Sequence, residues 1–273
     1  MIRASSADAI HQYRQSMLGT VGFVPTMGAL HDGHVALIRA SQQQCDHTIV
    51  SIFVNPTQFA PTDDFASYPR SLSDDARCCE SLGVCMLMCP TESVVYPNGN
   101  TTPRYQPDHD VATMLCGQFR PQFFYGVCNV VERLFRLVNP THAFFGDKDI
   151  QQRAIIEHMV ATLKIPITIV PCPIVRNKQG LALSSRNAYL TPDNMPMALA
   201  IPKALAMAKA CQTSQDFSHT VSQALHNSGV SMDYASVFRP IHRCLVHGPI
   251  QSGDHGCVAA RVGGIRLIDN HCF

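Results

Sequence analysis

Short apolar runs alternate with helix-like segments along the first two-thirds of the chain. The runs predict strands at residues 21–24, 48–54, 84–89, 143–145 and 167–170, and the run 48–54 is typical of a parallel strand buried on both faces. Between them, apolar residues three or four positions apart predict helices at residues 35–45, 71–82, 127–138 and 150–163. This alternation predicts an α/β fold with a Rossmann-like doubly wound parallel sheet.

The pattern changes after residue 176. Thr191-Pro192 predicts a helix cap, and Pro202 is expected to start, kink or break the helical run that follows. Residues 203–228 are typical of a helix, and short strands are expected at 234–238, 258–262 and 266–268. We therefore expect a Rossmann-like domain over 1–176 and a smaller C-terminal α+β domain over 177–273. The polar segment 90–107, with four prolines, is expected to be a surface loop.

Composition excludes several classes of partner. The chain has 273 residues, 46% of them hydrophobic, and a net charge of +1 from 21 basic and 20 acidic side chains. Without a basic stripe, nucleic acid is not an expected partner, and no apolar run is long enough for a membrane span. The N-terminus has no signal-peptide pattern, so we expect a cytoplasmic protein. The twelve cysteines show no C-x-x-C or zinc spacing, which predicts free and mostly buried thiols and no metal site.

The segment from Val24 to His34 carries the first candidate chemistry. It places His31 and His34 where a predicted strand meets a predicted helix. A helix N-terminus presents unpaired N–H groups to a phosphate, and Gly28 and Gly33 permit close backbone approach. Imidazoles there donate to phosphate oxygens and, if protonated, offset charge on a leaving phosphate. The alternative is an ordinary strand–helix turn with two surface histidines.

A second polar segment, Ser184-Ser185-Arg186, follows the last strand of the predicted sheet. Its hydroxyls and forked guanidinium suit phosphate oxygens, although such a triplet alone is usually just a loop. Together with His31 and His34, it resembles the layout of the nucleotidylyl-transferase superfamily. There, a His-x-Gly-His turn and a later basic loop hold the triphosphate of ATP.

A more specific resemblance rests on six segments that occur in order and span nearly the whole chain. They are Pro25-Thr26-Met27-Gly28, Ser51 to Phe59, Tyr68-Pro69-Arg70, Phe145 to Gln152, Gly180 to Asn187 and Arg266 to Asn270. In these segments the chain is similar to the pantothenate synthetase (pantoate–β-alanine ligase) family.

The resemblance implies an ATP-dependent, AMP-forming ligase that joins (R)-pantoate to β-alanine. The pantoate carboxylate attacks the α-phosphorus of ATP, giving pantoyl adenylate and pyrophosphate, and the β-alanine amine then displaces AMP to give pantothenate. The resemblance also implies Mg²⁺ with the ATP, a homodimer, and a C-terminal domain that acts as a lid. Pantoate, β-alanine and ATP are the expected partners.

The resemblance assigns site residues position by position. The catalytic groups are His31, His34 and Lys148. Contacts to ATP are expected from Met27, Gly28, His31, His34, Gly146, Asp147, Lys148, Asp149, Val175, Leu183, Ser184, Ser185 and Arg186. Contacts to pantoate or β-alanine are expected from Asn55, Gln58, Arg120 and Gln152, whose amides both donate and accept hydrogen bonds.

One loop departs from the family pattern. Cys116, Gln122 and Phe123 stand where the family usually has Glu, Gly and His. We expect Cys116 to leave Arg120 without a carboxylate partner and so freer for ligand, and Phe123 to pack away from ATP. Two alternatives stay open: another adenylyltransferase of the superfamily, and a catalytically weakened nucleotide-binding module.

Overall fold

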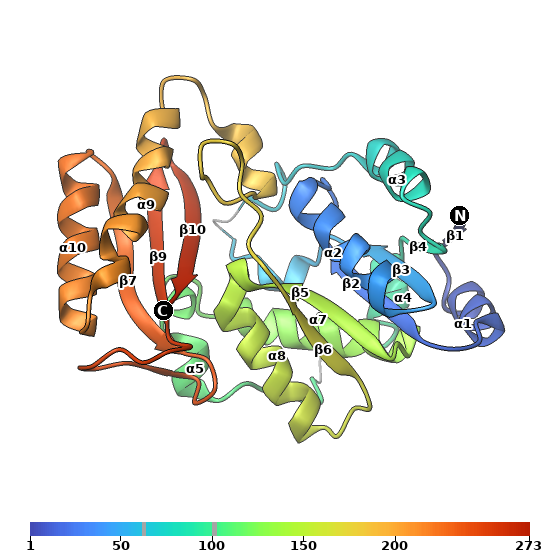
Figure 1. Ribbon diagram of the computed structural model, residues 1–273. Helices are drawn as coiled ribbons and strands as arrows, with labels where there is room; N and C mark the ends of the chain where they lie inside the picture. The colour runs from blue at the N-terminus through green and yellow to red at the C-terminus, as the bar shows by residue number, and fades with distance from the viewer. Residues whose placement is uncertain (62–63, 100–102) are drawn as a thin grey trace.

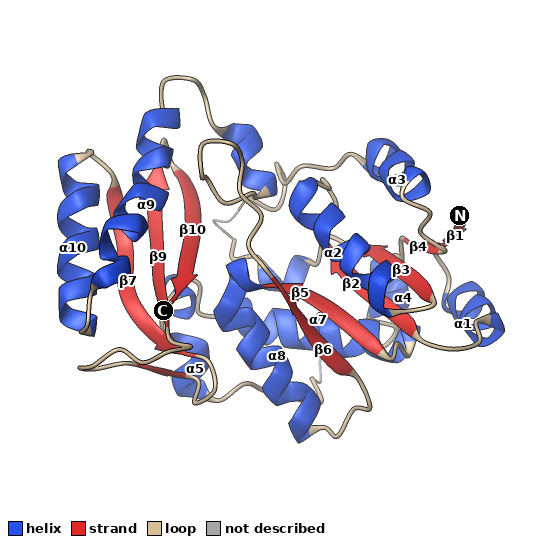
Figure 2. Cartoon of the chain, in the orientation of Figure 1, coloured by secondary structure: helices blue, strands red, loops and turns tan. Residues whose placement is uncertain are grey.

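The larger of two sheets is fully parallel and has the strand order β1-β4-β3-β2-β5-β6 (Figures 1 and 2). The computed structural model describes residues 1–61, 64–99 and 103–273. The strands are β1 (Ile2–Ala4), β2 (Val21–Thr26), β3 (His47–Ile52), β4 (Met86–Met88), β5 (His142–Gly146) and β6 (Thr168–Cys172). The predicted Rossmann-like sheet is confirmed, with β1 added at one edge.

Helices cover both faces of this sheet. They are α1 (Ala7–Ser16), α2 (Asp32–Gln44), α3 (Leu72–Ser81), α4 (Glu92–Val95), α5 (His109–Thr113), α6 (Cys116–Phe119), α7 (Phe123–Val138) and α8 (Ile150–Thr162), with 3₁₀ turns η1 (Pro56–Gln58) and η2 (Asp147–Asp149). One core joins α1, α7 and α8 to one face, and another joins α2 and α3 to the opposite face. Within the described residues, no helix is long and apolar enough to cross a membrane.

The sheet opens at the carboxyl ends of its two central strands. β2 pairs with β3 along its whole length, but with β5 only at Gly22 and Phe23. Pro25 has no N–H to donate, so it suits the part of β2 that has left β5. Strand order reverses between β2 and β5, and this is where ligands bind in open α/β sheets. The loops after β2 and β5 therefore flank a crevice.

The second, smaller sheet is antiparallel, with the order β10-β9-β7-β8. Its strands are β7 (Ser231–Arg239), β8 (Cys244–Leu245), β9 (His255–Val262) and β10 (Ile265–Cys272). α9 (Met195–Met207) and α10 (Ser214–Asn227) pack against it around one core, and 3₁₀ turns η3 (Ser185–Tyr189) and η4 (Ala208–Ala210) complete this part. The expected small α+β unit is confirmed, while the boundary at residue 176 stays a prediction.

Three expectations around α9 need correction. The helix begins at Met195 after Asn194, not at Thr191-Pro192, and the early proline is Pro196. Pro202 lies inside α9 and neither starts nor ends it, because the buried apolar face of the helix outweighs local propensity, while a kink at Pro202 stays a prediction. The run 203–228 is interrupted by η4 and a turn before α10 starts at Ser214.

The segment 90–107 was also misjudged as a plain surface loop. It contains α4, and Val95, Tyr96 and Tyr105 are buried in the main core. Its residues 100–102 lie outside the described residues. Prolines and polar residues dominate the sequence, and the buried side chains are too irregularly spaced to give a periodic signal.

Candidate active site

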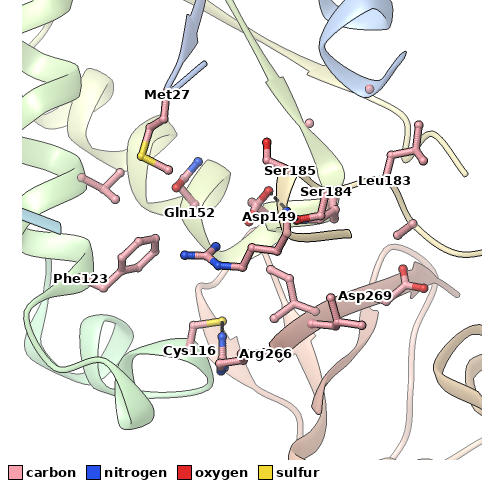
Figure 3. A pocket seen from close by; sticks show the side chains of 18 of the residues that line it. Met27, Cys116, Phe123, Asp149, Gln152, Leu183, Ser184, Ser185, Arg266 and Asp269 are labelled. Carbon is pink, nitrogen blue, oxygen red and sulfur yellow. Dashed lines mark hydrogen bonds and ion pairs between the residues drawn. The ribbon is translucent and has the colours of Figure 1, made fainter. Parts of the chain in front are cut away.

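A cavity of about 780 Å³ lies at the opened edge of the parallel sheet and is lined on the far side by residues of the smaller sheet (Figure 3). All but two of the expected site residues line it: Met27, His31, His34, Asn55, Gln58, Arg120, Gly146, Lys148, Asp149, Gln152, Val175, Leu183, Ser184, Ser185 and Arg186. The exceptions are Gly28, which faces Ile52 and Asp75, and Asp147, which turns away to pair with Arg153 at 2.7 Å.

The two histidines cap the first turn of α2. Nδ1 of His31 accepts a hydrogen bond from Gly33 N at 3.1 Å, and Nδ1 of His34 accepts one from His31 N at 3.3 Å. A ring nitrogen that accepts a backbone N–H carries no proton, so in the neutral ring the proton is on Nε2. Each imidazole therefore has an Nε2–H left to donate to a ligand.

Burial keeps both rings neutral. Burial, reinforced by the positive charge of Lys148, lowers the pKa of His31 to about 4. Burial and the neighbouring His31 and Lys148 lower the pKa of His34 to about 3. The idea that protonated imidazoles offset phosphate charge therefore does not describe the ligand-free site at pH 7. In the ligand-free site both rings are neutral, with Nε2–H as the available donor.

These pKa shifts predict a stability that falls in mild acid. The unfolded chain takes up protons near pH 6.5 whereas the folded site resists them until about pH 4, so protonation favours unfolding across that window. The free energy of unfolding should fall with decreasing pH by up to about 1.4 kcal/mol per pH unit for each histidine. Urea unfolding between pH 7 and 4 measures it. The double variant His31→Asn, His34→Gln should have a shallower slope, and an equal slope would contradict the prediction.

Asp75 shapes the turn before α2. Its buried carboxylate accepts hydrogen bonds from Ala29 N at 2.9 Å and Leu30 N at 2.8 Å, and from the Ser71 hydroxyl at 3.2 Å. Ala29 has a φ of 50°, a left-handed conformation in which non-glycine residues are strained. Asp75 thus holds a strained turn open for the two histidines, a role that sequence analysis did not assign.

Lys148 reaches the cavity from the loop after β5. Its Nζ lies 3.2 Å from Oδ2 of Asp149, and its side chain is 18% exposed. An added Cβ at the preceding Gly146 would meet nothing within 4 Å, so the loop backbone has free space there. The ammonium is a mobile point charge suited to phosphate oxygens.

The loop containing Ser184, Ser185 and Arg186 closes over the histidine turn. Ser185 Oγ donates to Ala29 O at 3.2 Å, while Arg186 forms two hydrogen bonds, of 2.8 and 3.0 Å, to the carboxylate of Asp64. The guanidinium therefore already has an anionic partner when no ligand is bound. Asp64 is a second residue that sequence analysis missed.

The two glutamines expected to orient substrate lie on the cavity wall. Gln58 Nε2 lies 2.9 Å from Met27 Sδ, and Figure 3 shows Met27 and Gln152 pointing into the same space. Asn55 lies behind Gln58, and its amide is engaged by Gln58, Thr57, Tyr96 and the Gly126 carbonyl. With its donors and acceptor used, Asn55 positions Gln58.

The loop with Cys116, Gln122 and Phe123, which departs from the family pattern, differs from expectation. Cys116 Sγ faces not Arg120 but Arg266, 3.6 Å from both terminal nitrogens, and the Tyr234 hydroxyl at 3.2 Å (Figure 3). Arg120 donates to Gln58 O at 3.1 Å and lies 3.9 Å above the Phe123 ring. The idea that Cys116 frees Arg120 was therefore wrong. Phe123 packs against Arg120 and lines the cavity, and its packing away from ATP stays a prediction.

Restoring the family residues in this loop should have a small effect. Arg266 already pairs with Asp233 at 2.7 Å, so a carboxylate at position 116 adds a second anion to a satisfied cation. The triple variant Cys116→Glu, Gln122→Gly, Phe123→His should change turnover less than tenfold, or about 1.4 kcal/mol of barrier. Steady-state AMP formation measures it. A hundredfold gain would show that the natural chain is a decayed enzyme.

The twelve cysteines all lie within the described residues and are free. Five are buried, six are half-buried and Cys272 is exposed, so fewer are fully buried than expected. Burial raises the pKa of the Cys128 thiol to about 12, which keeps it protonated. Such thiols pack as small apolar groups.

The fold and the site define a Rossmann-like protein whose switch-point crevice presents groups suited to phosphate. A family model for pantoate-beta-alanine ligase matches residues 3–272, and the chain belongs to that family. A pantothenate synthetase of Helicobacter pylori (strain Shi470) is 44% identical over 272 residues, covering 96% of each chain. A bifunctional pantoate ligase/cytidylate kinase of Synechococcus elongatus is 42% identical over 97% of this chain, which spans only 51% of that relative's length.

Solved structures agree with this assignment. Pantothenate synthetase from Thermus thermophilus superposes with a TM-score of 0.93 at 37% identity over 99% of both chains. A pantoate-beta-alanine ligase from Francisella tularensis, complexed with beta-gamma ATP and beta-alanine, superposes with a TM-score of 0.86 at 34% identity, over 100% of this chain and 97% of the other. The likeness covers both sheets.

Proposed function

We propose that this chain condenses pantoate with β-alanine, using ATP and passing through pantoyl adenylate. The observation that carries the proposal is the convergence of three separate segments on one cavity. The histidine turn follows β2, Lys148 follows β5, and the Ser184–Arg186 loop comes from beyond β6. Between them lie the amides of Gln58 and Gln152, which suit a hydroxy acid.

The first step is attack of the pantoate carboxylate on the α-phosphorus of ATP. A bond forms from a carboxylate oxygen to phosphorus, the bond to the bridging oxygen breaks, and pyrophosphate leaves with that electron pair. Such displacements depend on positioning and on neutralising oxygen charge. Lys148 supplies a full charge, the Nε2–H groups of His31 and His34 supply neutral donors, and Ser184, Ser185 and Arg186 bind the leaving phosphates.

The second step is attack of the β-alanine amine on the acyl carbon. A C–N bond forms, the bond to the adenylate oxygen breaks, AMP leaves with that electron pair, and the proton lost by the amine passes to solvent. Arg120, held above Phe123, places a positive charge on the wall that a substrate carboxylate can approach. Closure of the cavity by the smaller sheet protects the acyl adenylate from water.

Mg²⁺ fits this site as a companion of ATP. No cluster of three or more metal-ligating side chains occurs in the part of the chain that the structure describes. The acidic groups at the cavity, Asp64, Asp149 and Asp269, each face a cation of the protein. Mg²⁺ usually keeps waters and binds substrate phosphates with few protein ligands, so phosphate oxygens would hold it here and it would offset their charge. A homodimer is part of the proposal by family resemblance, and a cytoplasmic location is part of it as expected from the sequence pattern.

The first half-reaction should run without β-alanine. Carboxylate activation and amine attack are separable steps, so labelled pyrophosphate should exchange into ATP when pantoate and Mg²⁺ are present. Exchange that appears only after β-alanine is added would reject the two-step route. Exchange driven by other acids but not pantoate would favour another adenylyltransferase, and ATP binding without exchange would favour a weakened binding module.

A further inference from the structure

The loop that carries Lys148 is held by a residue of the other sheet. Asn270 lies in β10 and is 2% exposed. Its Nδ2 donates to the carbonyl oxygen of Asp147 at 2.8 Å and to that of Lys148 at 3.0 Å. The two N–H groups of one amide therefore bind two successive carbonyls of η2, more than 120 residues away in the sequence.

The orientation of the Asn270 amide follows from its partners. Two carbonyl oxygens accept and cannot donate, so the group facing them is the nitrogen. Oδ1 then faces His255 Nδ1 at 2.9 Å, and that nitrogen must be the protonated one. Burial lowers the pKa of His255, so its ring is neutral with a fixed tautomer. The amide is thus held at both ends.

The backbone of Asn270 is fixed as well. Its N–H donates to Asp269 Oδ1 at 2.8 Å, and Asp269 forms hydrogen bonds of 2.6 and 2.8 Å with Arg176. Within the loop, the side chains of Asp147 and Lys148 pair with Arg153 and Asp149, and the N-cap of η2, Gly146, has no side chain that could hold the backbone. Asn270 therefore adds contacts to the backbone itself of the Lys148 loop.

We propose that Asn270 is a positioning residue for Lys148: it fixes the backbone of η2 so that the ammonium points into the cavity, and it makes this placement depend on docking of the smaller sheet. The inference rests on the role of Lys148 in the proposed function. A lysine on a flexible stem neutralises charge in a transition state only if its backbone is well placed, and a displacement of about 1 Å can cost about a hundredfold in rate. Deleting the amide also removes a donor from each of these two carbonyls.

A double-mutant cycle tests this proposal, with pantoate-dependent pyrophosphate exchange as the readout. Asn270→Ala should lower the maximal exchange rate about 10- to 100-fold and change the KM for ATP less than about threefold. In a Lys148→Ala background, the same substitution should change the rate less than about threefold. If Asn270→Ala lowered the exchange rate by the same factor in both backgrounds, the inference would be overturned while the proposed function would stand. A Lys148→Ala variant with unchanged exchange would overturn both the inference and the proposed role of Lys148.

Two further variants separate positioning from stability. Asn270→Asp keeps the acceptor for His255 but removes both donors. Its loss of exchange should also be large with Lys148 present and small in the Lys148→Ala background. The proposal can therefore be tested even if Asn270→Ala does not fold. Asp254→Asn is the matched control, because Asp254 is 1% exposed and forms two 2.7 Å hydrogen bonds with Arg239, next to the same sheet but away from the cavity. It should lower the thermal midpoint yet keep exchange within about twofold. If Asp254→Asn lost as much exchange as Asn270→Ala, the losses in both variants would be explained by lower stability, and the inference would be overturned.

Discussion

Replacing Lys148 by alanine is expected to lower turnover by about two to three orders of magnitude, the usual effect of removing a donor to developing charge. Lys148 is the only lysine on the cavity wall among the described residues, and the histidines beside it are neutral. When pyrophosphate leaves, Lys148 is expected to supply a full positive charge that the neutral histidines do not, whereas Arg186 is already paired with Asp64. Most of the loss should therefore appear in kcat and in the exchange rate.

The control for Lys148 is Lys203→Ala. Lys203 is exposed on α9 and away from the cavity, so alanine there removes the same charge without touching the site. Steady-state kinetics, with folding checked by circular dichroism, should leave this variant within about twofold of the natural chain. A Lys148→Ala loss below about fivefold would reject the assigned role.

Replacing His34 by alanine should have an effect of similar size, about two to three orders of magnitude. The side chain has two roles. Its Nδ1 accepts the N–H of His31 and completes the cap of α2, and in the proposed function its Nε2–H donates to phosphate. Alanine removes both. His34→Gln retains an amide donor and should recover part of the turnover.

A thermal melt separates the two roles of His34, because it reports the stability that depends on the helix cap and not phosphate binding. Loss of a helix cap costs about 1 kcal/mol of stability, far less than the barrier change that a thousandfold loss represents. His219→Ala, on the exposed face of α10, is the matched control and should be neutral in both assays. If His34→Ala loses only stability, its function is to cap the helix and not to bind phosphate.

The sequence predicted those parts of the fold that depend on local pattern. Apolar runs identified five of the six strands of the parallel sheet, β2 to β6, and helical spacing identified α2, α3, α7 and α8. β1 and α1 were not predicted, because β1 is a three-residue edge strand with two exposed residues and α1 buries only Ile10. Neither gives the long apolar signal of a central element.

Site residues on motifs were predicted better than their partners. Lys148 and Arg186 reach the cavity as expected, but Asp64, Asp75 and Asn270 act through contacts with segments distant in sequence. No spacing rule reveals such contacts. Asp147 shows the limit within a motif: adjacent residues of a 3₁₀ turn point in different directions, so Lys148 faces the cavity while Asp147 faces Arg153.

The pairing of Arg186 with Asp64 affects how ionic strength acts on nucleotide binding. A triphosphate that engages Arg186 replaces the Asp64 carboxylate, so the guanidinium exchanges one anion for another instead of gaining its first. Salt weakens the Arg186–Asp64 pair that is broken as well as the contact between Arg186 and the triphosphate that is formed, and the two effects partly cancel. Affinity for ATP should therefore vary less steeply with salt than the number of cations around the cavity suggests. Before ATP binds, the Asp64 carboxylate also offsets the desolvation cost of a guanidinium that would otherwise be half-buried without an anionic partner.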